Sequence, residues 1–139
     1  KNTKAEQLEA AQQYAEKVLA TLGEATTEKV HVGQLDVGSN VIALTNAIKA
    51  IRAKHPHLAV LLLSPEEVKG KGKITIVSQV SDELVAAGLK ANEWAGAVAA
   101  VLGGKGGGKP QTAQGSGSDL TKVEDALALA RSFVGKALQ

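Results

Sequence analysis

The chain has 139 residues, a formal net charge of +2 and no cysteine. This length suits one compact domain and is too short for an enzyme with several domains. The lack of cysteine excludes disulfides, thiolate nucleophiles and cysteine-ligated metal centres within the chain. Hydrophobic residues make up 44% and aromatic residues only 2%, so we expect a closely packed core of small aliphatic side chains.

The positive charge is concentrated in one part of the chain. Between Lys69 and Ser118 there are six lysines and three acidic residues, which gives this segment a local charge of +3 and leaves −1 elsewhere. No apolar run approaches the ~20 residues that span a bilayer. The first residues also lack the charged and then apolar pattern of a secretion signal. We therefore expect a cytoplasmic protein without a membrane partner.

Residues 4–22 are predicted to form a helix that ends at Gly23. No clear capping residue precedes Lys4, so the chain is expected to begin within a longer helix. An ordinary packed first helix is the alternative. The apolar residues that recur at helical spacings of three and four are Leu8, Ala11, Ala15, Val18 and Leu22.

A strand, a helix and a second strand are predicted next. Residues 29–37 have a short β-type pattern, and Ser39 or Asn40 is expected to cap the helix. The helix is expected to end before Pro56, because proline disfavours helical geometry in the preceding residue. Residues 58–63 form a nearly continuous apolar run, typical of a central strand covered on both faces. This order predicts a βαβ crossover, and hence an α/β fold with a small sheet and flanking helices.

The following segment is expected to contain a helical turn, a strand and a short helix. Ser64-Pro65-Glu66-Glu67 combines a capping serine, a proline at the first helical position and a glutamate at the third, which predicts the turn. Residues 74–80 predict a strand. Ser81 or Asp82 is then expected to cap a short helix that ends at Gly88.

Two further helices are predicted in the C-terminal half. Asn92 is expected to cap the first, which ends at Gly103. Trp94 is expected in the core rather than stacked on a base, because its neighbours on that face are aliphatic. Ser118 or Asp119 is expected to cap the second, which runs almost to the end of the chain.

Residues 103–117 are predicted to form a loop that binds an anion. They hold nearly half of the fifteen glycines in the chain, with Lys105 and Lys109 among them. Glycines let backbone N–H groups turn inward around an anion and let a ligand approach the main chain closely. A flexible glycine–serine linker is the alternative. The helices predicted on both sides favour a functional loop within a domain.

The same loop matches the Gly-x-x-x-x-Gly-Lys spacing of a P-loop through Gly103, Gly108 and Lys109. However, Pro110 stands where a P-loop has the serine or threonine that binds magnesium, and a helix precedes the loop where a strand is required. A dinucleotide-binding motif would need glycine at position 109. Nucleotide hydrolysis and dinucleotide binding are therefore disfavoured.

We expect neither a catalytic site nor a metal site. His55 and His57 flank a proline without a nearby carboxylate, which favours an exposed loop, and His31 lies in a predicted strand. The serines and acidic residues show no nucleophile elbow, no distinctive pair of carboxylates and no His–Asp pattern.

The sequence between residues 88 and 114 contains four motifs in a distinctive order. They are Gly88-Leu89-Lys90-Ala91, the segment 94–102, Gly-Gly-Lys-Gly-Gly-Gly-Lys-Pro at 103–110, and Ala113-Gln114. This order resembles the C-terminal domain of alanyl-tRNA synthetases. That domain belongs to the wider DHH-associated group, which also occurs in phosphoesterases that act on short nucleic acids or nucleotides.

The resemblance implies a small α/β unit on a helical, often self-associating stem. Residues 1–23 would then be a stem remnant and a homodimer contact, and residues 24–139 the globular nucleic-acid-binding unit. In that family the domain binds the elbow of the L-shaped tRNA and supports aminoacylation and editing of tRNA(Ala), without bond chemistry of its own. The implied partners are tRNA(Ala) and the remaining domains of the parent synthetase. No cofactor is expected here, since the parent enzyme would use ATP, Mg and Zn through domains absent from this chain.

Carried over to this sequence, the resemblance places Lys105 and Lys109 against phosphate or ribose and the glycines at a surface that RNA approaches closely. Gln111 and Thr112 depart from the acidic residue and methionine that many family members have after the proline. Self-association, binding of another nucleic acid such as DNA, and a phosphoesterase role are the alternatives. The expected nucleic-acid-binding residues are Lys90, Gly103, Gly104, Lys105, Gly106, Gly107, Gly108, Lys109, Pro110, Gln114 and Ser116.

Overall fold

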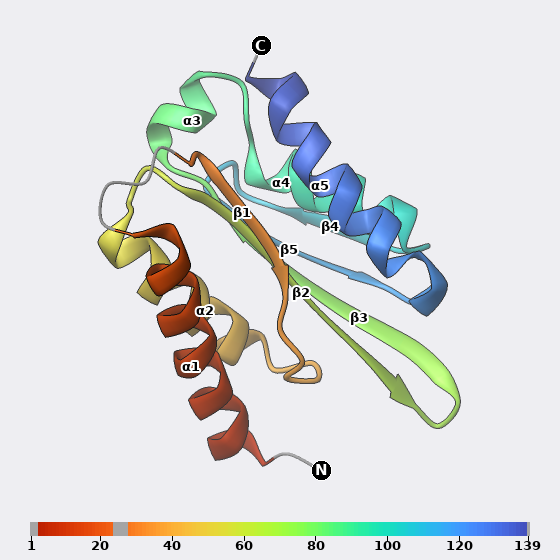
Figure 1. The fold of residues 1–139 in the computed structure, drawn as a ribbon. Coiled ribbons are helices and arrows are strands. Elements are labelled where there is room, and N and C mark those ends of the chain that lie inside the picture. The colour runs from red at the N-terminus through yellow and green to blue at the C-terminus, as the bar shows by residue number, and fades with distance from the viewer. Residues whose placement is uncertain (1–2, 24–27, 139) are drawn as a thin grey trace.

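The computed structural model describes residues 3–23 and 28–138. The predicted boundary between residues 23 and 24 therefore borders a segment outside the described residues. The described part forms a five-stranded sheet with helices on both faces (Figure 1). Its elements are α1 (Lys4–Leu22), β1 (Val30–Gln34), α2 (Val41–Lys54), β2 (Ala59–Val68), β3 (Lys71–Gln79), α3 (Asp82–Ala86), α4 (Ala91–Val101), β4 (Lys105–Gly108), β5 (Thr112–Gly117), the 3-10 turn η1 (Leu120–Lys122) and α5 (Val123–Ala137).

The strands follow the order β1-β2-β3-β5-β4 across the sheet. β1 and β2 are parallel and are joined by α2, whereas β2–β3, β3–β5 and β5–β4 are antiparallel pairs. The predicted βαβ crossover and the α/β fold class are thus confirmed. β2 lies inside the sheet, and its first residues, Ala59 to Leu63, are fully buried. All five residues are apolar because both faces of the sheet are covered at this position.

Two hydrophobic cores lie on the two sides of the sheet. Val60 and Leu62 of β2 pack with α1 and α2, and Leu61 and Leu63, which point the other way, pack with α4 and α5. Figure 1 shows α1 and α2 on one side and α4 and α5 on the other. Because successive residues of a strand point to opposite faces, one short apolar segment contributes to both cores.

α1 begins with a capping box. The Thr3 hydroxyl accepts a hydrogen bond from the Glu6 backbone N–H at 3.1 Å, and the Glu6 carboxylate accepts one from the Thr3 N–H at 2.8 Å. The prediction that no cap precedes Lys4 was therefore wrong. The buried residues Ala11 and Ala15 let α1 pack closely against α2. The division into a stem remnant at 1–23 and a globular unit at 24–139 stays a prediction.

β2 continues through residues 64–67, so the predicted helical turn there was wrong. Pro65 pairs with Ile74 of β3, and it lies beyond Leu63, where the pairing with β1 ends. A proline is tolerated at this point because the strand is an edge strand there. The Ser64 hydroxyl does not cap a helix but accepts a hydrogen bond from the Val37 N–H at 2.9 Å.

A tight turn at Lys69 and Gly70 joins β2 to β3. Both residues have positive φ, 53° and 78°, as a two-residue hairpin turn with right-handed strand twist requires. β5 pairs with β3 only from Ile74 onward, so the tip of this hairpin extends beyond its neighbours in the sheet (Figure 1).

α4 begins at Ala91 and is not capped by Asn92 as predicted. Lys90 is the N-cap residue and makes no side-chain cap. Asn92 lies in the first turn, where its Oδ1 is buried without a hydrogen-bond partner among the described residues. Of the two caps predicted for the short helix α3, Ser81 and Asp82, the structure has Ser81. The prediction that Trp94 lies in the core is confirmed.

A tyrosine–histidine pair joins α1 to β1. The Tyr14 hydroxyl lies 2.7 Å from His31 Nε2. Burial raises the pKa of Tyr14 to about 12. Burial, together with the positive charge of Arg131, lowers the pKa of His31 below its ordinary value. A Cβ at Gly33 would overlap the Tyr14 hydroxyl, so a larger residue at this position would have to displace the Tyr14–His31 pair.

The free energy of unfolding is expected to decrease as the pH falls below the ordinary histidine pKa of 6.5. Between the pKa of His31 in the unfolded chain and its lower pKa in the folded chain, the unfolded chain binds more protons at this residue. Lowering the pH through this interval therefore favours unfolding, and the effect levels off below the folded-state pKa. Urea unfolding at about pH 7.5 and about pH 5 checks this, with His31→Gln as the non-titrating control. The same pH dependence in both proteins would show that His31 is not responsible.

Candidate nucleic-acid interface

Most of the predicted loop at 103–117 is a β-hairpin, so the prediction of a loop was wrong for residues 105–108 and 112–117. β4 and β5 pair antiparallel, with Lys105 opposite Ser116 and Gly108 opposite Ala113. The turn is closed by a hydrogen bond of 2.8 Å from the Lys109 N–H to the Thr112 carbonyl. High glycine content is typical of loops. Here, glycine also allows two strands to pack directly against a helix.

The glycines of the hairpin are needed first for packing. A Cβ at Gly106 would stand 3.0 Å from the Ala95 carbonyl of α4. A Cβ at Gly117 would collide with the Leu102 side chain, and one at Gly104 with the Ser116 carbonyl. Gly107 differs, since a Cβ there would meet no atom within 4 Å. The hairpin therefore turns a nearly side-chain-free surface toward α4, which lets the backbones approach closely.

Backbone hydrogen bonds fix both ends of the hairpin. At the turn, the Ala91 N–H donates to the Pro110 carbonyl at 2.7 Å. At the base, the N–H groups of Ser118 and Asp119 both donate to the Leu102 carbonyl, at 2.8 and 3.0 Å. The hairpin is thus held along the length of α4, which excludes the flexible linker considered as an alternative.

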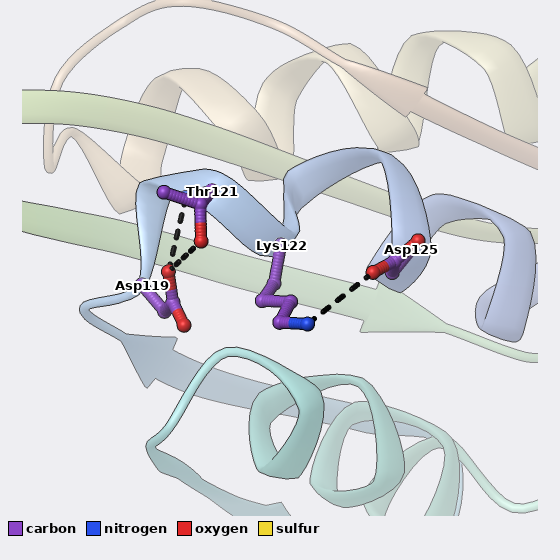
Figure 2. A network of polar contacts seen from close by, with 4 residues as sticks. All are labelled: Asp119, Thr121, Lys122 and Asp125. Carbon is purple, nitrogen blue, oxygen red and sulfur yellow. Dashed lines mark hydrogen bonds and ion pairs between the residues drawn. The ribbon is translucent and has the colours of Figure 1, made fainter.

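A small polar network continues this anchoring into α5 (Figure 2). The Asp119 carboxylate accepts hydrogen bonds from the N–H and the hydroxyl of Thr121 and so caps η1. These bonds, with the nearby charge of Lys122, lower the pKa of Asp119. Lys122 Nζ lies 3.8 Å from the Asp125 carboxylate (Figure 2). Of the two predicted caps, Ser118 and Asp119, Asp119 caps the 3-10 turn that leads into α5.

The side of the hairpin that faces away from α4 is polar and exposed. Lys105 lies opposite Ser116 on this side, and Gly107 opposite Gln114. They border a shallow depression of about 320 Å³ that is lined by Lys105, Gly106, Gly107, Gln114, Gly115 and Ser116. The structure therefore brings Lys105, Gln114 and Ser116, three of the predicted binding side chains, onto one surface.

The other predicted side chains gather at the opposite end of the hairpin. Lys109 and Pro110 form its turn, and Lys90 precedes Ala91, which is bonded to Pro110. Lys90 and Lys109 are both exposed. The predicted set thus forms two groups, one on the outer face of β4–β5 and one at the turn.

The prediction omitted two lysines that share the outer side of the sheet. Lys71 and Lys73 lie on β3 and are exposed. Their alternation with glycine in Lys69-Gly70-Lys71-Gly72-Lys73 was a visible signal for a basic strand with both lysines on one face.

The outer face offers amines, hydroxyls and an amide, which bind anions and hydrogen-bond to ribose or phosphate. Within residues 3–23 and 28–138 the one ion pair joins Lys122 and Asp125, so Lys105 and Lys109 are not neutralised by a carboxylate. No three histidine or acidic side chains in these ranges lie close enough to hold a metal ion. His55 was expected in an exposed loop but is 6% exposed, because it caps α2 at the edge of the core.

Comparison with known protein families assigns this chain to a family. The family model described as the DHHA1 domain matches residues 27–136. The chain belongs to this family.

Curated relatives of this DHHA1 domain are alanine–tRNA ligases. The cytoplasmic enzyme of Dictyostelium discoideum is 42% identical over 124 residues, which are 88% of this chain and 13% of the relative. The cytoplasmic enzyme of Caenorhabditis elegans is 38% identical over 138 residues, 98% of this chain and 14% of the relative. The DHHA1 domain thus spans about one seventh of the length of these relatives.

A solved structure with the same fold is the C-Ala domain of alanyl-tRNA synthetase from Aquifex aeolicus. It superposes with a TM-score of 0.64 at 27% identity, over 81% of this chain and 94% of that chain. The family assignment and the fold therefore agree with the resemblance seen in residues 88–114. None of the described helices is both long and apolar enough to cross a membrane.

Proposed function

We propose that this DHHA1 domain is the non-catalytic C-terminal accessory part of an alanyl-tRNA synthetase. In this role it binds the elbow of tRNA(Ala) and supports aminoacylation and editing by the parent enzyme in the cytoplasm. Similarity to two cytoplasmic alanine–tRNA ligases and to a C-Ala domain supports the setting. ATP, Mg and Zn would act in other domains of the parent enzyme, and this domain needs no cofactor of its own.

The observation that carries the RNA-binding proposal is the exposed outer face of the β4–β5 hairpin. Lys105 stands there without an ion-pair partner, directly opposite the Ser116 hydroxyl, and next to the unobstructed backbone of Gly107. A phosphate can approach such a backbone closely and meet a positive charge and a hydrogen-bond donor together. Lys109 adds a second charge at the turn.

Lys105→Ala/Lys109→Ala is expected to weaken tRNA(Ala) binding and to lower the salt dependence. Each phosphate contact contributes about 0.9 to the slope of log affinity against log salt, so the slope should fall by nearly 2 and the affinity by at least tenfold near 0.1 M salt. Fluorescence anisotropy titrations at about 0.05 and about 0.2 M salt measure both quantities. Neither ATP nor alanine is needed for binding.

Lys122→Ala/Lys136→Ala is the matched control, because it removes the same charge from η1 and α5 on the other side of the sheet. This variant should bind tRNA(Ala) like the unchanged chain. Equal affinity and equal salt slope for the hairpin variant and the unchanged chain would remove the hairpin from the RNA-binding mechanism.

Self-association through the N-terminal helix is the second candidate. The apolar face of α1 packs against α2, so it is not free for another copy. Leu8 and Ile42 remain 39% and 68% exposed beside a groove of about 560 Å³. A concentration series in analytical ultracentrifugation tests this candidate. A monomer at every concentration, together with tight tRNA binding, would exclude it.

A further inference from the structure

One side of the sheet is left open over β5 and β4. Ala113 of β5 points toward α4 and is buried, whereas its neighbours Thr112 and Gln114 point the other way and are exposed. On that other side, Val77 of β3 packs in the core with α1 and α2. The face covered by α1 and α2 over β2 and β3 therefore continues as an open polar surface over β5 and β4.

The strand register places further lysines on this open side. Lys105 is opposite Ser116, and Ser116 is opposite Thr75 of β3. Lys73 and Lys71 lie two and four residues before Thr75, so they share its side of the strand. The intervening position 72 faces the opposite side of the sheet, because a Cβ built on Gly72 would stand 2.8 Å from Leu120 Cγ.

The spacing of these lysines suits the phosphates along one strand of a duplex. With strands about 4.8 Å apart and residues about 3.4 Å apart along a strand, the Cα atoms of Lys105 and Lys73 are separated by about 12 Å. Each strand of a DNA duplex carries one charge per about 3.4 Å of helix axis, so on that scale the separation covers a few phosphates along one strand. Thr75 between them is 8% exposed, so the surface there is formed by Ser116 and the lysine side chains.

The local charge on this surface is positive. Lys71, Lys73 and Lys105 have no carboxylate within ion-pair distance in the described ranges. Glu66 is the cross-strand partner of Lys73, but its carboxylate is turned toward the loop before α2, with Oε1 3.2 Å from the position of a Cβ on Gly38. The amines of Lys71, Lys73 and Lys105 therefore outnumber the single Glu66 carboxylate, which is turned away, and the surface attracts phosphate.

The surface has no ring on which a base can stack. The chain has one tryptophan, one tyrosine and one phenylalanine. Trp94 of α4 is buried and donates a hydrogen bond to the Ala130 carbonyl. Tyr14 of α1 is hydrogen-bonded to His31, and Phe133 of α5 is half-buried against the core. Proteins that hold single strands use exposed aromatic side chains as stacking platforms. A duplex needs none, because its bases stay stacked inside and its backbone is the accessible part.

We propose that the surface from Lys105 across Ser116 to Lys73 and Lys71, here termed the lysine track, binds the phosphodiester backbone of base-paired RNA. This inference rests on the proposed function and extends it beyond the β4–β5 hairpin. The track holds RNA through phosphate and ribose contacts from amines and hydroxyls. Recognition along it depends on backbone shape rather than on base identity.

Lys71→Ala/Lys73→Ala is the test variant, compared with the unchanged chain and with Lys122→Ala/Lys136→Ala. Each protein is titrated with tRNA(Ala), with a short RNA hairpin duplex and with a single-stranded RNA of equal length, at two salt concentrations. The test variant should bind tRNA and duplex at least tenfold more weakly than the unchanged chain. The slope of its log affinity against log salt should be smaller by nearly 2. The unchanged chain should prefer the duplex to the single strand, and Lys122→Ala/Lys136→Ala should match the unchanged chain.

The outcomes separate this inference from the proposed function. If Lys105→Ala/Lys109→Ala weakens tRNA binding while Lys71→Ala/Lys73→Ala leaves affinity and slope unchanged, the lysine track is wrong and the hairpin site stands. Equal affinity of the unchanged chain for duplex and single strand would overturn the claim of base-paired RNA. If the unchanged chain binds no tRNA at either salt concentration, the proposed function itself fails. Circular dichroism confirms that each variant is folded.

Discussion

Trp94→Ala is expected to lower the free energy of unfolding by about 3–5 kcal/mol, the usual cost of truncating a large buried aromatic side chain. Trp94 is fully buried in the core between the sheet and α4–α5. Its Nε1 donates a hydrogen bond of 2.8 Å to the Ala130 carbonyl, which ties α4 to α5. Small neighbours such as Ala95 and Ala99 cannot fill the space that alanine would leave.

Urea unfolding followed by circular dichroism measures this loss. Trp94→Phe is the informative control, because it keeps most of the apolar volume and removes the hydrogen bond, for a smaller loss of about 1–2 kcal/mol. If Trp94→Ala cost no more than Trp94→Phe, the ring would not be a main contributor to the core. The two variants together separate the contribution of volume from that of the link to Ala130.

The part of the fold that was predictable from the sequence depends on local patterns. The run 58–63 is apolar at every position, and residues 59–63 of this run form the part of β2 that is buried on both faces. Asn40 was one of two predicted caps, and it accepts the Ala43 N–H of α2 at 3.0 Å. Such signals involve residues within a few positions of one another, so they are readable without the tertiary structure.

The wrong predictions share a physical cause, which is pairing between distant segments. Ser64-Pro65-Glu66-Glu67 has the local pattern of a capped helical turn, yet pairing with residues 72–75 of β3 holds it extended. Residues 103–117 have a loop composition, but pairing with β3 and packing on α4 make residues 105–108 and 112–117 strands. Tertiary contacts override local preference in both places.

The candidate site was predictable in its residue types more than in its geometry. Lys105 and Lys109 are four residues apart, and they were expected to act together in one loop. In the hairpin, Lys105 faces the open side of the sheet while Lys109 lies in the turn near Lys90. Lys73, thirty-two positions before Lys105, shares the open side with it only through the register of β3, β5 and β4. No sequence pattern contains that register.

Glycine has two roles in the hairpin, close packing at Gly104 and an open outer surface at Gly107, and experiment can separate them. Gly104→Ala is expected to destabilise the protein by roughly 1–3 kcal/mol, as forced overpacking does. The added Cβ would overlap the Ser116 carbonyl and stand 2.8 Å from Gly117 Cα. These are backbone atoms of β5, so relief of the overlap requires the strand itself to move.

Gly107→Ala is the matched variant, because a Cβ there meets no atom within 4 Å. Its stability should stay within about 0.5 kcal/mol of the unchanged chain, as for an ordinary surface substitution. Urea unfolding of both variants measures the contrast, and tRNA titration of Gly107→Ala then reports on close approach to the outer face without a stability change. Equal destabilisation by the two substitutions would mean that the hairpin needs glycine for strand flexibility rather than for the contact between Gly104 and β5.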